Sequence, residues 1–143
     1  MGMVDVSEKK VIPRSASAGG RIILNPQSIA AIRQGQVKKG DPLAIAEVAG
    51  MTAAKQTSLL IPHCHQLPLD QVSFDFVVTD EGVEATCRVK CVAKTGVEME
   101  ALVGVTIALN TILDMVKYLE KDDLGLYPTT VITDIRVINK IKG

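Results

Sequence analysis

Apolar and polar residues alternate along two neighbouring stretches in the middle of the chain. Every second residue is apolar over 72–78, and the same period of two returns over 83–93. This period is typical of a strand with one buried face, and the turn residues at 80–82 make the two stretches a predicted hairpin. Cys87 and Cys91 fall on its apolar face, too far apart along a strand to form a disulfide.

Helices are predicted from capping signals and from one long apolar run. Asn25-Pro26 and Asp41-Pro42 each place a capping residue before a proline, which predicts helices over about 26–34 and 42–58. A third helix is expected from Thr95, as part of a capping box with Glu98, to about residue 121. Short apolar stretches at 21–24 and 131–138 are predicted as strands.

The resulting order is strand, helices, strand, strand, helix, strand. This is the split βαβ pattern, so the expected fold class is α+β and ferredoxin-like, with one antiparallel sheet and helices on one face. No repeat or linker divides the 143 residues, a length typical of one domain. Residues 1–20 are polar and aperiodic and are expected to form an N-terminal arm, which leaves 21–143 as a single ferredoxin-like catalytic domain.

Composition narrows the classes of partner. A net charge of zero gives no general attraction to nucleic acid or to an anionic membrane, and 3% aromatic residues offer few platforms for base stacking. Three cysteines without a secretory leader indicate reduced thiols in a cytoplasmic protein. The uncharged run at 101–113 is too short to span a bilayer. An apolar fraction of 47% on a short chain favours a homo-oligomer.

Charged residues stand at both ends of that apolar run. Glu98 and Glu100 precede it, and Asp114 and Lys117 follow it. Unpaired buried charge is costly, so such groups are usually paired or functional. A capping box is one explanation of Glu98, and a surface ion pair is one explanation of Asp114 with Lys117, although the uncharged run before that pair weakens the second explanation. Neither the capping box nor the surface ion pair explains why a carboxylate stands at Glu100.

Two further segments carry candidate chemistry. His63 and His65 flank Cys64, and a neutral histidine is a natural proton carrier near pH 7. The pair could also ligate a metal, but no further ligands stand at recognisable spacing, so no metal is expected. Lys39 lies just before a predicted helix start, where it suits a phosphate, although a solvated turn is the better explanation of an isolated Lys-Lys-Gly.

The spacing of Glu100 and Asp114 restricts any shared site. Fourteen residues apart on one helix, they share a face to within about 40° but are separated by about 21 Å of rise. One straight helix cannot bring both to one small molecule. The site is therefore completed by a second copy of the chain, or the helix breaks.

Four segments are specific enough to compare with a known family. They are Lys-Gly-Asp at 39–41 before an Ala-rich helix, Leu-Ile-Pro-His-Cys-His at 60–65, Lys-Thr-Gly-Val-Glu-Met-Glu-Ala at 94–101 and Asp-Met-Val-Lys at 114–117. Together they resemble the cyclic pyranopterin monophosphate synthase (MoaC) family of molybdenum cofactor biosynthesis. The opening Met-Val-Asp-Val-Ser at 3–7 is also similar to it.

The resemblance implies a ferredoxin-like lyase that needs no cofactor. Its small-molecule substrate would be 3′,8-cyclo-7,8-dihydro-GTP, which is rearranged to cyclic pyranopterin monophosphate with release of pyrophosphate. It also implies a homohexamer built as a trimer of dimers, with active sites at the dimer interface.

The resemblance also implies roles for individual residues. Asp114 matches the family's catalytic aspartate, and the other matching active-site positions are Lys117, Lys39, His65, Glu98 and Glu100. Substrate-binding positions are His63, Cys64, His65, Met99, Glu100 and, as a triphosphate contact, Arg14. The family's Gly-rich tail is absent here, and only Lys140 and Lys142 stand in its place.

Two other functions remain open from the residues alone. A His-x-His metal-dependent hydrolase acting on a nucleotide would bind stoichiometric zinc. A non-catalytic module that senses a nucleotide or pterin would keep its function when Asp114 is replaced.

Overall fold

The computed structural model describes all 143 residues, which form four strands and four helices. The strands are β1 (Ile12–Ile23), β2 (Leu69–Val78), β3 (Gly82–Ala93) and β4 (Val131–Lys142). The helices are α1 (Pro26–Gln34), α2 (Pro42–Lys55), α3 (Thr57–Leu60) and α4 (Glu98–Glu120).

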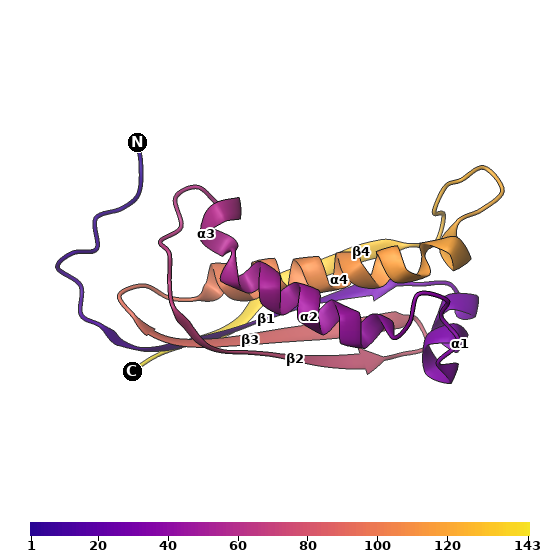
Figure 1. Cartoon of the computed structure of the whole chain (residues 1–143), viewed down its shortest axis with the longest axis horizontal. Helices are drawn as coiled ribbons and strands as arrows, with labels where there is room; N and C mark the ends of the chain where they lie inside the picture. The colour runs from indigo at the N-terminus through magenta and orange to yellow at the C-terminus, as the bar shows by residue number, and fades with distance from the viewer.

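All four strands join one antiparallel sheet in the order β2-β3-β1-β4. Helices α2 and α4 run along one face of this sheet (Figure 1). The core between the two layers is aliphatic, and the largest of its fully buried side chains are Ile22, Leu109 and Ile112. The predicted α+β, ferredoxin-like arrangement is confirmed.

Strand β1 is much longer than the sequence pattern indicates. The predicted strand at 21–24 begins at Ile12, so the expectation of an arm over 1–20 is wrong for residues 12–20, which lie between β3 and β4. The strand is hard to recognise because its middle residues are small. A Cβ atom on Gly20 would lie 2.9 Å from Cδ1 of Leu109 in α4, so this part of β1 is small where the helix comes close.

The central hairpin follows its prediction closely. Phe74 and Phe76 of β2 pack against the core, and Cys87 and Cys91 of β3 are buried free thiols. The turn needs Gly82, since its φ of 157° is rare for other residues and a Cβ there would overlap the backbone of Ile22.

Capping was predicted correctly at two helices and wrongly at the third. The side chain of Asn25 accepts from the Ser28 N–H at α1, and that of Asp41 accepts from the first amides of α2. Helix α4 begins at Glu98 with Val97 at the N-cap and no side-chain cap, so the capping box is wrong. The Glu98 carboxylate pairs with Lys140 of β4 instead.

Helix α4 is long and apolar enough to cross a membrane by length and composition. Half of its most apolar 18-residue window is nevertheless buried within the fold, against the sheet and α2. The uncharged run is therefore explained as the inner face of a core helix, which must be apolar on the side that packs.

The two long helices cross at a pair of glycines. A Cβ atom on Gly50 of α2 would lie 2.8 Å from the carbonyl oxygen of Gly104 in α4 and would overlap the ring of Phe74. The absence of side chains lets the two backbones approach closely, and this contact sets how α4 lies across the sheet.

Replacing Gly50 by Ala should destabilise the fold by about 1–3 kcal/mol, because the added methyl group overpacks the crossing. The direction of the change in the free energy of unfolding distinguishes the two cases, since replacing Gly by Ala at an open helix position stabilises the fold by about 1 kcal/mol. Urea unfolding at fixed protein concentration measures the change. Glu47→Ala, at an exposed position of α2, is the control. A stabilised Gly50→Ala protein would contradict the close crossing.

Candidate functional site

The predicted site residues fall into two groups at opposite ends of α4. The carboxyl-end group consists of Lys39, Asp114 and Lys117. The amino-end group consists of Arg14, His63, Cys64, His65, Glu98, Met99 and Glu100. Helix α4 runs unbroken through all 23 residues, so about 21 Å of helix rise separates Glu100 from Asp114. A single chain therefore does not bring the two groups together.

In the carboxyl-end group, two lysines hold one carboxylate. Lys39 Nζ lies 3.3 Å from Asp114 Oδ2 and donates to the Asp114 carbonyl oxygen at 2.9 Å. Lys117 Nζ lies 3.4 Å from the other carboxylate oxygen. The hydrogen bond and the charge of Lys39, followed by those of Lys117, lower the pKa of Asp114. The aspartate is thus a solvent-accessible anion at neutral pH.

The loop before α2 places Lys39 over Asp114. The Lys38 N–H donates to the Tyr118 hydroxyl of α4 at 2.8 Å, which ties the loop to the same helix. Gly40 then turns the chain with a φ of 120°, and Asp41 caps α2. The Asp41-Pro42 capping signal in the sequence thus lies two residues after Lys39, the lysine that contacts Asp114 of α4.

In the amino-end group, the central carboxyl group is buried. Glu100 is only 4% exposed, and burial, followed by the charge of Glu98, raises its pKa. Burial, with a further contribution from Glu100, also raises the pKa of the Cys64 thiol. Met99, the residue before Glu100 in α4, is exposed. The loop that carries His63, Cys64 and His65 therefore lies beside Glu100.

Lys140 joins the amino-end group through the sheet. Strand β4 pairs Lys140 with Ala16 of β1, and the Lys140 ammonium lies 3.0 Å from Glu98 Oε1. The predicted strand ended at residue 138, so the sequence pattern did not place Lys140 in β4, which extends to Lys142. A side chain at Gly96 would overlap the Glu98 carboxylate, so this glycine leaves room for the ion pair.

Arg14 was expected in a free arm and is found in β1. It is 7% exposed, and its guanidinium donates to the carbonyl oxygens of Ala93 and Lys94 at 3.4 and 3.0 Å. The arginine therefore holds the loop that leads into α4. It also lines a hollow of about 310 Å³ together with Cys91.

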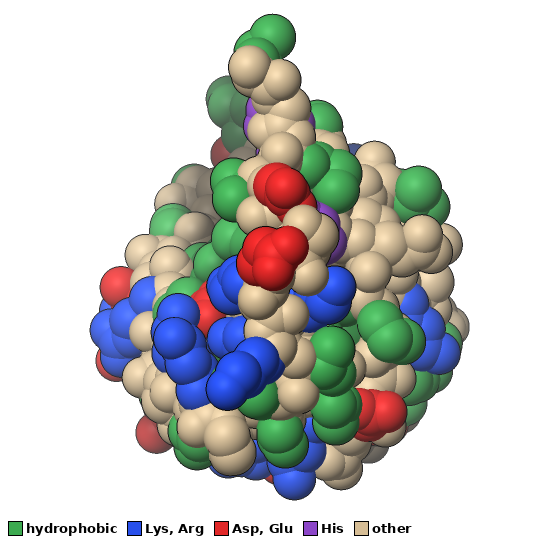
Figure 2. Space-filling view, turned by 90° about the vertical axis from the view of Figure 1, so that its left-hand side faces the viewer, with side chains coloured by type: hydrophobic (Ala, Val, Ile, Leu, Met, Phe, Trp, Pro, Cys, Tyr) green, Lys and Arg blue, Asp and Glu red, His purple; other side chains and the backbone are tan.

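The histidines differ in their contacts. His65 Nε2 lies 2.8 Å from the carbonyl oxygen of Val4, whereas His63 is exposed and has no hydrogen bond partner in the chain. No three His, Cys, Asp or Glu side chains are grouped closely enough to hold a metal ion. Figure 2 shows this end of the molecule, where Lys and Arg side chains gather beside the N-terminal segment and the histidines.

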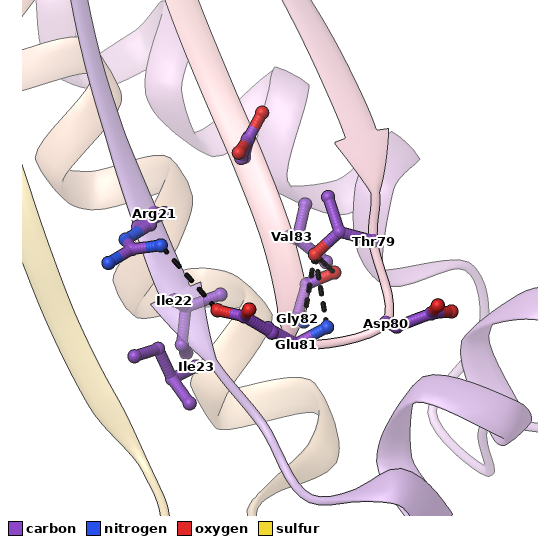
Figure 3. A pocket seen from close by; sticks show the side chains of 9 residues that line it. Arg21, Ile22, Ile23, Thr79, Asp80, Glu81, Gly82 and Val83 are labelled. Carbon is purple, nitrogen blue, oxygen red and sulfur yellow. Dashed lines mark hydrogen bonds and ion pairs between the residues drawn. The ribbon is translucent and has the colours of Figure 1, made fainter.

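A hollow at the β2–β3 turn lies outside both groups. It measures about 170 Å³ and is lined by Arg21, by the turn from Thr79 to Gly82 and by neighbouring residues (Figure 3). Its Arg21–Glu81 ion pair, at 3.7 Å, is largely exposed to solvent. Ion pairs exposed to solvent contribute little to the stability of the fold. None of the predicted site residues lines this hollow.

Comparison with known proteins covers almost the entire chain. The MoaC family model matches residues 3–143. A protein of Methanocorpusculum labreanum named probable cyclic pyranopterin monophosphate synthase is 57% identical over 141 residues, which is 99% of this chain and 89% of that protein. Proteins with the same name are 53% identical in Thermococcus kodakarensis and 51% in Aeropyrum pernix. Both alignments cover 99% of this chain. They cover 90% of the Thermococcus kodakarensis protein and 97% of the Aeropyrum pernix protein.

Replacing Lys39 by Met should raise the pKa of Asp114 toward its ordinary value of 3.8, because Lys39 is the main cause of the lowering. Lys117→Met is the matched comparison and should raise the pKa less. A titration of the Asp114 carboxyl carbon by NMR measures both. A larger rise in Lys117→Met would contradict the arrangement described for this group.

Replacing Glu100 by Gln should remove part of the pH dependence of stability. Between pH 4.5, the ordinary pKa of a glutamate, and the raised pKa of Glu100, the folded state binds more protons than the unfolded state. The free energy of unfolding therefore falls as pH rises through this window, and Glu100→Gln abolishes that fall. Urea unfolding across the window measures it, with exposed Glu47→Gln as the control that keeps the wild-type slope.

Proposed function

The chain belongs to the MoaC family, and we infer from this premise that it makes cyclic pyranopterin monophosphate. It is an enzyme, a lyase of molybdenum cofactor biosynthesis, which converts 3′,8-cyclo-7,8-dihydro-GTP into this product with release of pyrophosphate. The observation that carries the conclusion is the match over 3–143, together with relatives at 51–57% identity across nearly their whole length. We further propose that it works in the cytoplasm, without nucleic acid or membrane partners.

We propose that the carboxyl-end group performs the central proton transfers. Ring rearrangement and formation of a cyclic phosphate require groups that both take and give protons. Asp114, an anion with a lowered pKa, is suited to accept a proton. Lys39 and Lys117 lie within 3.4 Å of it and are suited to donate one or to stabilise developing negative charge.

We propose that the amino-end group binds the substrate and supplies a second proton carrier. Glu100 has a raised pKa and is suited to hold a proton, while His65 is suited to pass one on. Arg14 has donors left over beyond its two backbone contacts, and Lys140 is a nearby ammonium. Both suit the triphosphate and the pyrophosphate that leaves.

We propose that one active site combines the amino-end group of one copy with the carboxyl-end group of another. The separation of about 21 Å along α4 supports this reading, because one small substrate does not span it. The edge strand β4 supports it as well, since its exposed apolar residues, among them Ile138 and Ile141, suit burial against another subunit. A homohexamer built as a trimer of dimers fits this arrangement.

Asp114→Asn should abolish turnover of the cyclised GTP intermediate, measured through the oxidised fluorescent derivative of the product. The carboxylate would be lost while the side-chain shape is kept. The exposed Asp123→Asn is the matched control and should retain wild-type activity. Full turnover in a folded Asp114→Asn protein would contradict the proposed role of this residue.

Mixing inactive variants tests the two-copy site. Asp114→Asn and Glu100→Gln change opposite groups, so random subunit exchange should restore about a quarter of the sites. Asp114→Asn mixed with Lys39→Ala should stay inactive, because both changes lie in the same group. Rescue in the second mixture, or none in the first despite proven exchange, would contradict the proposal.

A further inference from the structure

We propose that the amino-terminal segment Val4–Ser7 is a strap that fixes the tautomer and orientation of His65. The segment lies at the same end of the molecule as α3 and the loop that follows it (Figure 1), and its Val4 carbonyl oxygen contacts His65 of that loop. Its backbone contacts His65 of the amino-end group and Lys94 of the loop before α4. The inference deepens the proposed function, since it rests on His65 being part of the active site.

The first contact determines which ring nitrogen carries the proton. His65 Nε2 lies 2.8 Å from the Val4 carbonyl oxygen. A carbonyl oxygen only accepts, so Nε2 must be the donor in this bond. A neutral His65 held in this way carries its proton on Nε2 and has its lone pair on Nδ1, which makes no hydrogen bond within the chain. Nδ1 is therefore the nitrogen that takes or gives a proton during the reaction.

The second contact ties the strap to the loop before α4. The Lys94 ammonium donates to the Ser7 carbonyl oxygen at 3.4 Å, and the Lys94 carbonyl oxygen accepts from Arg14. The strap is thereby linked to the loop that leads directly to Glu98 and Glu100. Val4 is thus a positioning residue, acting through its main chain on a side chain of the site.

A local turn shapes the strap. The Asp5 carboxylate accepts from the Ser7 N–H at 2.9 Å, and this bond, with a smaller contribution from the charge of Lys94, lowers the pKa of Asp5. Of residues 1–10 only Val6 is partly buried, so the strap is held by these polar contacts and not by core packing. Such a segment detaches readily when its turn is removed.

Nitrogen NMR of the histidine rings in the full-length protein tests the strap without substrate. Spectra are taken at alkaline pH, once the ring nitrogen signals no longer change with pH, so that each ring is observed in its neutral form. His65 should show a single tautomer with the proton on Nε2. His63 is exposed and unbonded, and it should show the mixture of a free ring, which makes it the internal control. The free mixture at His65, or a proton on Nδ1, overturns the proposal.

Two variants of Asp5 separate positioning from a merely structural effect. Asp5→Ala removes the turn, so His65 should move toward the mixture seen at His63 and kcat should fall severalfold. Asp5→Asn keeps an acceptor for the Ser7 N–H and should retain the single tautomer and most of kcat. Unchanged tautomer and kcat in Asp5→Ala overturn the strap. A wild type with the single tautomer but no turnover would instead overturn the proposed function alone.

Discussion

The length and straightness of α4 constrain everything else in this molecule. The helix is held against the sheet by an aliphatic inner face and against α2 by the Gly50–Gly104 crossing. It therefore acts as a rigid spacer of about 21 Å between Glu100 and Asp114. Groups at opposite ends of such a spacer cannot meet within one chain, and the proposed two-copy site follows from this geometry.

The two ends of the spacer offer opposite environments to their carboxyl groups. Asp114 is exposed and paired with two lysines, so its pKa is lowered, whereas Glu100 is buried beside Glu98, so its pKa is raised. Pairs of titratable groups pushed in opposite directions are the usual means of running acid and base steps at one pH. In the proposed site, one subunit would supply the anion and its neighbour the protonated carboxyl group.

Local signals predicted most of the fold. The period of two in the hairpin, the caps at Asn25 and Asp41 and the end of α4 were correct, because each depends on neighbouring residues. Strand β1 was missed over 12–20, since its small residues reflect contact with α4 and carry no strand signal of their own. The capping box failed for a similar reason, because Lys140, distant in sequence, takes the Glu98 carboxylate. Contacts such as Val4 with His65 join backbone to side chain and leave no trace in composition.

A structure of the assembled Asp114→Asn protein with the cyclised GTP intermediate bound would show whether two copies of the chain share one active site. In that structure, one substrate molecule should be contacted by His65 and Glu100 of one copy and by residue 114 and Lys117 of another. A substrate contacted by a single copy, with its second group empty, would contradict the two-copy site and the role assigned to α4 as a spacer.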